Sequence, residues 1–331
     1  MKSIIVVGSV NLDLVCTGQR IPAPGETVTG DQFQTFHGGK GANQAVAIGR
    51  LGYPVSLVAK VGDDEFGDRL RNGLQAADVD VAAVGAAKGT ASGVALITVD
   101  AQGQNSITVV PGANGKLLPR DLDKALPRLR SAGMILAQLE IPMNTIEYLA
   151  EIADRFEIPL MLDPAPARAI SRDVLSRVTY LTPNETEASA LCGMPPANLN
   201  PDNAGEYAAK LLKSGAANVI IKMGGRGAYV AGADGTRMMV PSFKVRIVDS
   251  TAAGDAFNGG LAVALMRGMS LVEAARFAAA VGAVSVTRAG AQPAMPTARE
   301  VNRLLKGHSL NGHQLNGRGK KSSEKQEAMA L

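Results

Sequence analysis

The sequence predicts an α/β fold: a three-layer sandwich with a mostly parallel central sheet between helices and a small β lid. Apolar runs typical of buried strands, bounded by glycine, proline or polar residues, occupy residues 3–8, 55–62, 134–140, 158–166 and 218–227. Stretches typical of helices, at residues 40–52, 66–77 and 145–156, lie between them. Apolar strands that alternate with helices indicate parallel strands covered on both faces.

One region breaks this alternation and predicts the lid. Residues 92–114 form two strand-like runs around a polar, glycine-containing turn, which is typical of a hairpin. Residues 27–36 are also strand-like. We therefore expect one domain over residues 1–305, with a lid built from about 12–36 and 92–114.

The C-terminal part of the sequence contains one clear helix start, followed by a polar tail. Ser270 and Glu273 have the spacing of a capping box, so a helix should begin there. From residue 306 to 331 the sequence is polar and without period, which predicts a disordered tail.

Composition and charge indicate a soluble cytoplasmic protein. The 331 residues are 46% hydrophobic and 19% charged, and the tail carries +3 of the net charge of +4. The folded body is therefore nearly neutral, and we expect no nucleic-acid partner. Asp13 interrupts the first apolar run before it could serve as a signal peptide, and no run reaches the roughly 18 residues of a membrane span. Two cysteines fit a reducing compartment.

Several mechanisms are excluded by what the sequence lacks. Of its three histidines, His308 and His313 lie in the tail, which leaves His37 alone and rules out a histidine-based metal cluster. Neither a GxxxxGK[ST] phosphate loop nor a GxGxxG after a strand is present. A P-loop ATPase and a standard dinucleotide-binding protein are therefore not indicated.

The segment DSTAAGDAFNGG, at residues 249–260, predicts an anion site. A helix that begins near Ala253 would direct the free N–H groups of residues 252–255 outward, and its positive end attracts anions. Asp255 beside that anion could accept a proton from an attacking hydroxyl. Alternatively, Asp255 merely complements the helix dipole.

Two further polar clusters stand where they could converge with Asp255. GGKGANQAVA, at residues 38–47, is a glycine-rich turn that opens a helix and exposes Lys40 and Asn43. Residues 11–13 (NLD) follow the first strand, at the sheet edge where open α/β sheets bind ligands. An ordinary turn with a solvated lysine, and a plain loop aspartate at Asp13, are the competing interpretations.

Together, residues 38–47 and 249–260 resemble the two signatures of the ribokinase (phosphofructokinase-B type) family of sugar kinases. TPNETEA at 182–188 and GAQPAMP at 290–296 are similar to further family motifs, as are PGETVTG at 24–30 and DPAPAR at 163–168. The resemblance covers residues 3 to about 305. It implies ATP-dependent phosphorylation of D-ribose at O5 to give ribose 5-phosphate.

The resemblance assigns roles to individual residues on the sugar side. Asp255 is similar to the catalytic base, and the anion hole for the transferring phosphoryl group would be formed by Ala252, Ala253 and Gly254. The sugar site implied by the resemblance contains Asn11, Leu12, Asp13, Gly39, Lys40, Gly41, Ala42, Asn43, Glu140 and Asp255. Glu140 could instead be a surface charge at a strand end.

The resemblance also implies an ATP site, Mg²⁺ and activation by K⁺. The ATP site would contain Asn184, Lys222, Met223, Gly224, Gly225, Arg226, Gly227, Gly254, Asp255 and Ala279. Glu187 would belong to the Mg²⁺ network, although Asn184 and Glu187 also fit a helix cap, and residues 222–227 fit an ordinary turn between strands. The monovalent-cation site would contain Asp249, Thr251, Ser285, Arg288, Gly290 and Ala294.

Two positions depart from the family pattern. Ala279 stands near the expected adenine, where relatives often carry a larger polar residue, so that shape and apolar contact would hold the base. Ala294 stands where relatives commonly have serine, which removes one side-chain oxygen from the cation site. By the same resemblance, the lids of two subunits would pair into a homodimer and cover their strand edges.

Other functions remain open at this level. The enzyme could phosphorylate another furanose or a nucleoside, such as 2-deoxyribose or adenosine, although the polar side chains at Asn11, Asp13, Lys40 and Asn43 favour a free sugar. A sugar- or nucleotide-binding regulator without catalysis is the second alternative. A nucleic-acid binder that acts through the tail is the third, and it predicts strongly salt-dependent binding.

Overall fold

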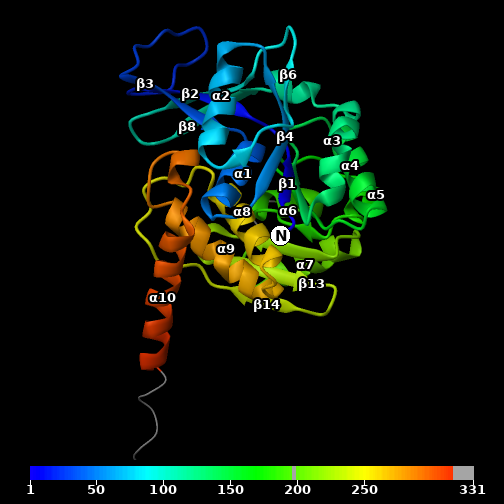
Figure 1. The fold of residues 1–331 in the computed structure, drawn as a ribbon. Coiled ribbons are helices and arrows are strands. Elements are labelled where there is room, and N and C mark those ends of the chain that lie inside the picture. Colours follow the sequence, from blue (N-terminus) through cyan, green and yellow to red (C-terminus); the bar gives the residue numbers. More distant parts are fainter. Residues whose placement is uncertain (196–198, 316–331) are drawn as a thin grey trace, which may run out of the picture.

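The computed structural model describes residues 1–195 and 199–315, which form a central sheet between two helical layers and a smaller sheet at one end (Figure 1). In spatial order the central sheet contains β14 (Arg237–Val240), β13 (Ala228–Gly232), β12 (Asn218–Lys222), β11 (Tyr180–Leu181), β10 (Leu160–Asp163), β9 (Met134–Gln138), β1 (Ile4–Val7), β4 (Val55–Gly62) and β5 (Val79–Asp80), with β6 (Val84–Ala87) paired to β4. The pairs β12–β13 and β13–β14 are antiparallel, and the others are parallel. The prediction of a mostly parallel sheet is confirmed.

The two faces of this sheet bury separate sets of side chains. Along β1, Ile4 and Val6 belong to one apolar cluster, whereas Ile5 and Val7 belong to the other, as the two-residue period of a strand requires. The first cluster packs against α1 (Lys40–Arg50), α2 (Glu65–Ala76), α8 (Ala253–Met266), α9 (Leu271–Ser285) and α10 (Ala298–Leu315). The second packs against α3 (Pro119–Ser131), α4 (Met143–Arg155), α5 (Arg172–Leu175), α6 (Glu185–Leu191) and α7 (Ala204–Lys213).

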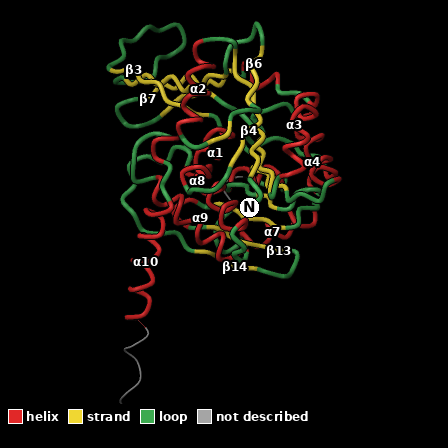
Figure 2. Tube along the Cα trace, in the orientation of Figure 1, coloured by secondary structure: helices red, strands yellow, loops and turns green. Residues whose placement is uncertain are grey.

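The smaller sheet is the predicted lid. Its order is β3 (Gln32–Gly38), β2 (Asn11–Thr17), β7 (Gly93–Val99) and β8 (Asn105–Val110), and it stands off the central sheet (Figure 2). The antiparallel β7–β8 pair confirms the predicted hairpin. The boundary predicted at residues 27–36 is wrong, because β2 ends at Thr17, opposite Gln32, and leaves residues 27–31 without a strand to pair with.

The C-terminal helices correct one boundary and confirm another. Helix α9 begins after Ser270, whose hydroxyl accepts from the N–H of Glu273, so the predicted capping box is confirmed. Helix α10 continues to Leu315, nine residues beyond the start of the predicted tail at 306, because the helix begun at Ala298 meets no proline there. Residues 316–331 lie outside the described residues. No helix within residues 1–195 and 199–315 is long and apolar enough to cross a bilayer.

Candidate active site

Polar side chains end several neighbouring strands of the central sheet. Strand β9 ends at Gln138, β10 at Asp163 and β12 at Lys222, and the parallel register pairs Asp163 directly with Gln138. A single bridge also pairs Asn184 with Lys222. Because the carboxyl ends of parallel strands meet at one edge, these side chains line a common site at the place where open α/β sheets bind ligands.

The start of α8, where the sequence predicts an anion site, is a strained turn. The helix begins at Ala253, as predicted, after Ala252 in the left-handed conformation with φ 57° and ψ 17°. A side chain in this region costs about 1–3 kcal/mol and indicates a functional constraint. One expectation is wrong: the N–H of Ala253 is not free but donates to the carbonyl of Ser250 at 3.2 Å, because the turn folds back on itself.

Asp255 lies in the first turn of α8 and is only 4% exposed. Its Oδ2 accepts from Nδ2 of Asn43 at 3.0 Å, and its Oδ1 accepts from Nε2 of Gln44 at 3.1 Å. Burial raises the pKa of Asp255, and the charge of Lys40 opposes this rise. Asp255 is therefore buried and accepts hydrogen bonds from two side-chain amides, in addition to standing at the positive end of the helix dipole.

The predicted sugar residues surround Asp255 from the lid side. Gly39 precedes α1 with φ 86°, and a Cβ there would lie 2.7 Å from the backbone nitrogen of Asn11, so the close approach of lid and helix requires glycine. Oε2 of Glu140 accepts from the backbone N–H of Lys40 at 3.0 Å and from the hydroxyl of Ser9. Glu140 is thus tied into the site rather than a surface charge at a strand end.

Two charged sugar-side groups have shifted pKa values. Burial, together with the charges of Glu140 and Asp255, raises the pKa of Asp13 to about 7. Burial alone would lower the pKa of Lys40, but the carboxylates that surround its ammonium hold that pKa well above its usual range. Lys40 therefore partly compensates the negative charge of the carboxylates that surround it.

The expected nucleotide side begins at Lys222. Its Nζ forms an ion pair with Oδ1 of Asp163 at 2.9 Å, and the two side chains are 12% and 3% exposed. Asn184 and Glu187 form a reciprocal cap at the start of α6, where the N–H of Asn184 donates to Glu187 at 2.8 Å. Gly224, Gly225 and Arg226 form the tight turn between β12 and β13, which Gly227 ends.

Some predicted side chains point away from the site. Leu12 alternates to the opposite face of β2 from Asn11 and Asp13, and its side chain is buried in the core. Ala42 and Met223 are also core residues, so only their backbone groups remain for ligand contacts. The guanidinium of Arg226 forms an ion pair with Glu185 at 2.7 Å on the surface.

The predicted cation residues lie on two segments, one before α8 and one at and after the end of α9, which meet at Asp249. Asp249 accepts from the N–H of Thr251 at 2.9 Å and from the N–H of Gly290 at 2.8 Å, and its own N–H donates to Val286, directly after Ser285. Although burial opposes them, these hydrogen bonds hold the pKa of Asp249 below its usual value. Arg288 forms an ion pair with Glu300 at 3.1 Å, and the methyl group of Ala294 is buried nearby in the turn Gln292–Ala294.

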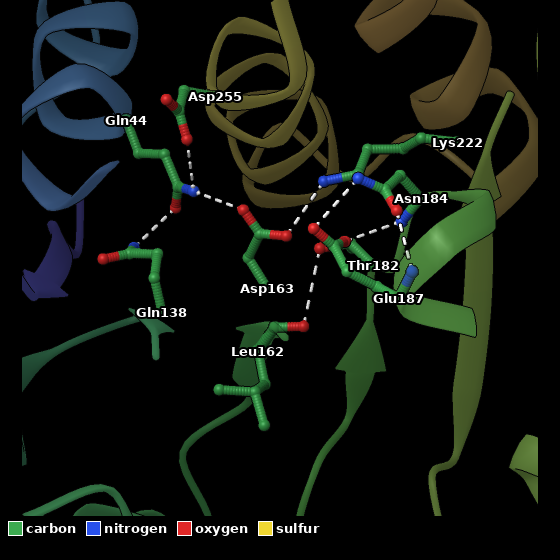
Figure 3. A network of polar contacts seen from close by, with 9 residues as sticks. All are labelled: Gln44, Gln138, Leu162, Asp163, Thr182, Asn184, Glu187, Lys222 and Asp255. Atoms are coloured by element: carbon green, nitrogen blue, oxygen red, sulfur yellow. Dashed lines mark hydrogen bonds and ion pairs between the residues drawn. The ribbon is translucent and has the colours of Figure 1, made fainter. Parts of the chain in front are cut away.

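The structure also shows polar residues that sequence analysis missed. Gln44, Gln138 and Asp163 are all buried and hydrogen-bonded to one another or to Asp255 (Figure 3). Asn114 is buried as well, and its Nδ2 donates to Oδ1 of Asn11 at 2.7 Å. A signal was present for Asp163, which ends an apolar run just as Glu140 does.

No group of three or more His, Cys, Asp or Glu side chains that could hold a metal ion occurs in the described part of the chain. Asp163 faces Lys222, and Glu187 caps its own helix. A divalent ion at this site needs further ligands from a bound substrate, such as phosphate oxygens.

Comparison with known proteins agrees with this geometry. The profile of the pfkB family of carbohydrate kinases matches residues 1–298. A ribokinase of Bacillus subtilis is 43% identical over 92% of this chain and 100% of its own, and a deoxyribokinase of Salmonella typhi is 36% identical over 93% and 99%. The structure of Arabidopsis thaliana ribokinase complexed with ribose and ATP superposes with a TM-score of 0.87 at 34% identity, over 92% of this chain and 99% of that one. The chain thus belongs to the pfkB family of carbohydrate kinases.

Proposed function

We propose that the protein transfers the γ-phosphoryl group of ATP to O5 of D-ribose, with Asp255 as the base. The observation that carries this proposal is the position of Asp255, at the N-terminus of α8 and between the two polar clusters. Asn43 contacts it from the sugar side, and Gln44 links it to Asp163 and so to Lys222 on the nucleotide side. The similarity to ribokinases supports ribose as the sugar.

The chemistry follows from this placement. Asp255 accepts the proton of the sugar 5-hydroxyl while the hydroxyl oxygen attacks the γ-phosphorus in line, and the bond from that phosphorus to the leaving ADP oxygen breaks. The N–H groups of Gly254 and Asp255 at the start of α8 would face the anion that is transferred, and the positive helix end would stabilise its charge. Positioning and charge stabilisation are most of what phosphoryl transfer requires.

Mg²⁺ and K⁺ fit the residues that are present. Glu187 accepts two hydrogen bonds from Asn184, which leaves lone pairs on its carboxylate, and it would hold Mg²⁺ that neutralises phosphate charge. Asp249 would supply a carboxylate oxygen, and backbone carbonyls of the two segments that meet there would supply the other ligands for K⁺, even without a side-chain oxygen at Ala294. Bound K⁺ would fix the loop that leads into α8.

The lid carries the surface that the proposed homodimer would bury. Strand β8 is exposed along its whole length. Phe33 and Ile107 are 66% and 53% exposed, and Leu96 and Val109 are also exposed. Pairing of two lids would cover these apolar side chains and the free strand edge.

A panel of acceptors tests the proposed substrate. With Mg²⁺-ATP and K⁺, ADP release should be fastest with D-ribose, when compared with 2-deoxyribose, fructose and adenosine. Loss of the 2-hydroxyl leaves buried polar groups without a partner, so 2-deoxyribose should have a kcat/KM lower by about tenfold or more. Higher kcat/KM for 2-deoxyribose would assign the chain to deoxyribokinases, and ATP binding without turnover on any sugar would indicate a regulator.

Ribose binding should depend on pH through Asp13. The pKa of Asp13 near 7 means that this carboxyl is half protonated at neutral pH in the free protein. Sugar hydroxyls donate to the ionised form, so ribose affinity should fall by about tenfold for each pH unit below 7 and should level off above it. Calorimetric titrations from pH 5.5 to 8.5 measure this slope. Asp13→Asn should bind ribose more weakly and without the pH dependence, whereas an unchanged slope in that variant would rule out Asp13 as its source.

A further inference from the structure

A chain of primary amides reaches Asp255 from inside the protein. Nε2 of Gln138 donates to Oε1 of Gln44 at 2.7 Å, and Nε2 of Gln44 donates to Oδ1 of Asp255 at 3.1 Å and to Oδ2 of Asp163 at 3.0 Å (Figure 3). Gln44 and Gln138 are 1% and 0% exposed, so water does not compete for these bonds. Gln44 thus bridges two carboxylates with a single NH₂ group.

The polarity of this chain is determined by its ends. Ionised carboxylates only accept hydrogen bonds, so Gln44 must turn its NH₂ group toward Asp255 and Asp163. Its oxygen then points the other way, where the NH₂ group of Gln138 holds it. Without Gln138, that oxygen would lose its hydrogen-bond donor, and only the two carboxylates would hold the amide of Gln44 in this direction.

Gln138 is held in this orientation at a cost. Its Oε1 is buried without a hydrogen-bond partner and lies against Gly8, where an added Cβ would be 2.1 Å away. A buried acceptor without a partner costs about 1–3 kcal/mol. Gln138 therefore keeps the orientation in which its NH₂ group donates to Gln44, although its own oxygen is left without a hydrogen bond.

A second chain of two amides has the same polarity. Nε2 of Gln292 donates to Oδ1 of Asn43 at 3.3 Å, and Nδ2 of Asn43 donates to Oδ2 of Asp255 at 3.0 Å. Each oxygen of Asp255 therefore accepts a hydrogen bond from an amide NH₂ group. The oxygen of that same amide in turn accepts a hydrogen bond from a glutamine. The repetition of one arrangement on both oxygens indicates that the direction of the amides serves Asp255.

We propose that Gln138 is a positioning residue that acts through Gln44, fixing the direction of its amide so that Asp255 stays oriented and ionised for proton acceptance. This inference rests on the proposed role of Asp255 as the base. The hydrogen bond from Gln44 favours the charged carboxylate, whereas a carbonyl oxygen in its place would disfavour it.

Charged groups on several elements also face Asp255. Lys40 from α1 favours the ionised carboxylate, whereas Asp163 from β10 disfavours it, and Lys222 from β12 neutralises Asp163. Asp13 from β2 also faces Asp255, and the charge of Asp255 contributes to the raised pKa of Asp13. These charges remain when Gln138 is replaced, so a shift in the titration of Asp255 would report the amide chain.

The test is a double-mutant cycle with Gln44→Met and Gln138→Met, which keep side-chain length but remove the amides. The readout is the single-turnover rate of ribose 5-phosphate formation against pH, at saturating ribose and ATP, where ribose holds Asp13 ionised. The control is Thr145→Val, which removes one buried hydrogen bond, to the carbonyl of Leu117, in helix α4 on the other face of the sheet. Calorimetric ATP binding and thermal melting confirm that each variant is folded.

In Gln44→Met, the acid limb of the rate profile should move to higher pH by about one unit, the effect of losing one hydrogen bond to a charged group. Gln138→Met should move it in the same direction, and the double variant should match Gln44→Met alone. Thr145→Val should melt at a lower temperature, and the acid limb of its rate profile should stay at the wild-type pH. If Gln138→Met does not fold, Gln138→Asn withdraws the amide by one methylene and replaces it in the cycle.

Two results would overturn the inference: an unmoved acid limb in the Gln138 variant, or a Gln138 shift that adds in full to that of Gln44→Met. The proposed base is tested separately by Asp255→Asn. If Asp255→Asn is inactive and the limb of the Gln138 variant stays in place, only the amide chain is wrong. If Asp255→Asn keeps its turnover, the proposed base is wrong, and the amide chain falls with it.

Discussion

Replacement of Asp255 by asparagine should lower turnover by about 10²-fold or more while ATP still binds. Asparagine has nearly the shape of aspartate but cannot take a proton from the sugar hydroxyl. The N–H groups at the start of α8 are backbone groups, so the anion site should survive the change. Because burial raises the pKa of Asp255, the charge itself opposes folding at neutral pH, and its removal should not unfold the protein.

The measurements are the single-turnover rate with ribose, the calorimetric affinity for ATP, and the melting temperature. A low rate with intact ATP affinity and a melting temperature that does not fall assigns Asp255 to the chemical step. Near-wild-type turnover would remove Asp255 as the base. Loss of ATP affinity together with turnover would instead point to a collapsed anion site, since asparagine must turn its own NH₂ group toward one of the amides of Asn43 and Gln44.

The sequence predicted those elements whose local pattern and packing agree. Strand β4 coincides with the predicted residues 55–62, because its apolar run is buried on both faces. Strands β5 and β11 have two residues each, too few for any period to show. The lid strand at β3 was misplaced because threonine and valine at residues 27–29 favour a strand locally, but only pairing with β2 decides where it begins.

The site was predictable where the chemistry is local to a motif. The start of α8 at Ala253 follows from small residues before an apolar helix, and Asn43 follows from its glycine-rich turn. Gln138 and Gln44 were missed because their roles depend on distant pairing: the register of β9 with β10 places Gln138 beside Asp163. A glutamine at the end of an apolar strand gives no such signal by itself.

Lys222→Met should lower the free energy of unfolding by about 3–5 kcal/mol, the typical loss when one partner of a buried ion pair is removed. Methionine fills the volume of the lysine side chain but leaves Asp163 as a buried charge that keeps only the hydrogen bond from Gln44. Surface ion pairs are worth far less, so the size of the loss depends on the burial of Asp163. Urea unfolding at neutral pH measures it.

Asp163→Asn combined with Lys222→Met is the matched control, because it removes both charges. The double variant should recover most of the lost stability, which gives a coupling energy that identifies the ion pair as the cause. Recovery should not extend to activity, since Lys222 also stands near the anion site: a Cβ on Gly254 would lie 3.6 Å from its Nζ. A loss below about 1 kcal/mol in Lys222→Met, as for an exposed pair, would contradict this account. Such a result would indicate that the charge of Asp163 is compensated by Lys40, the other cation that faces it.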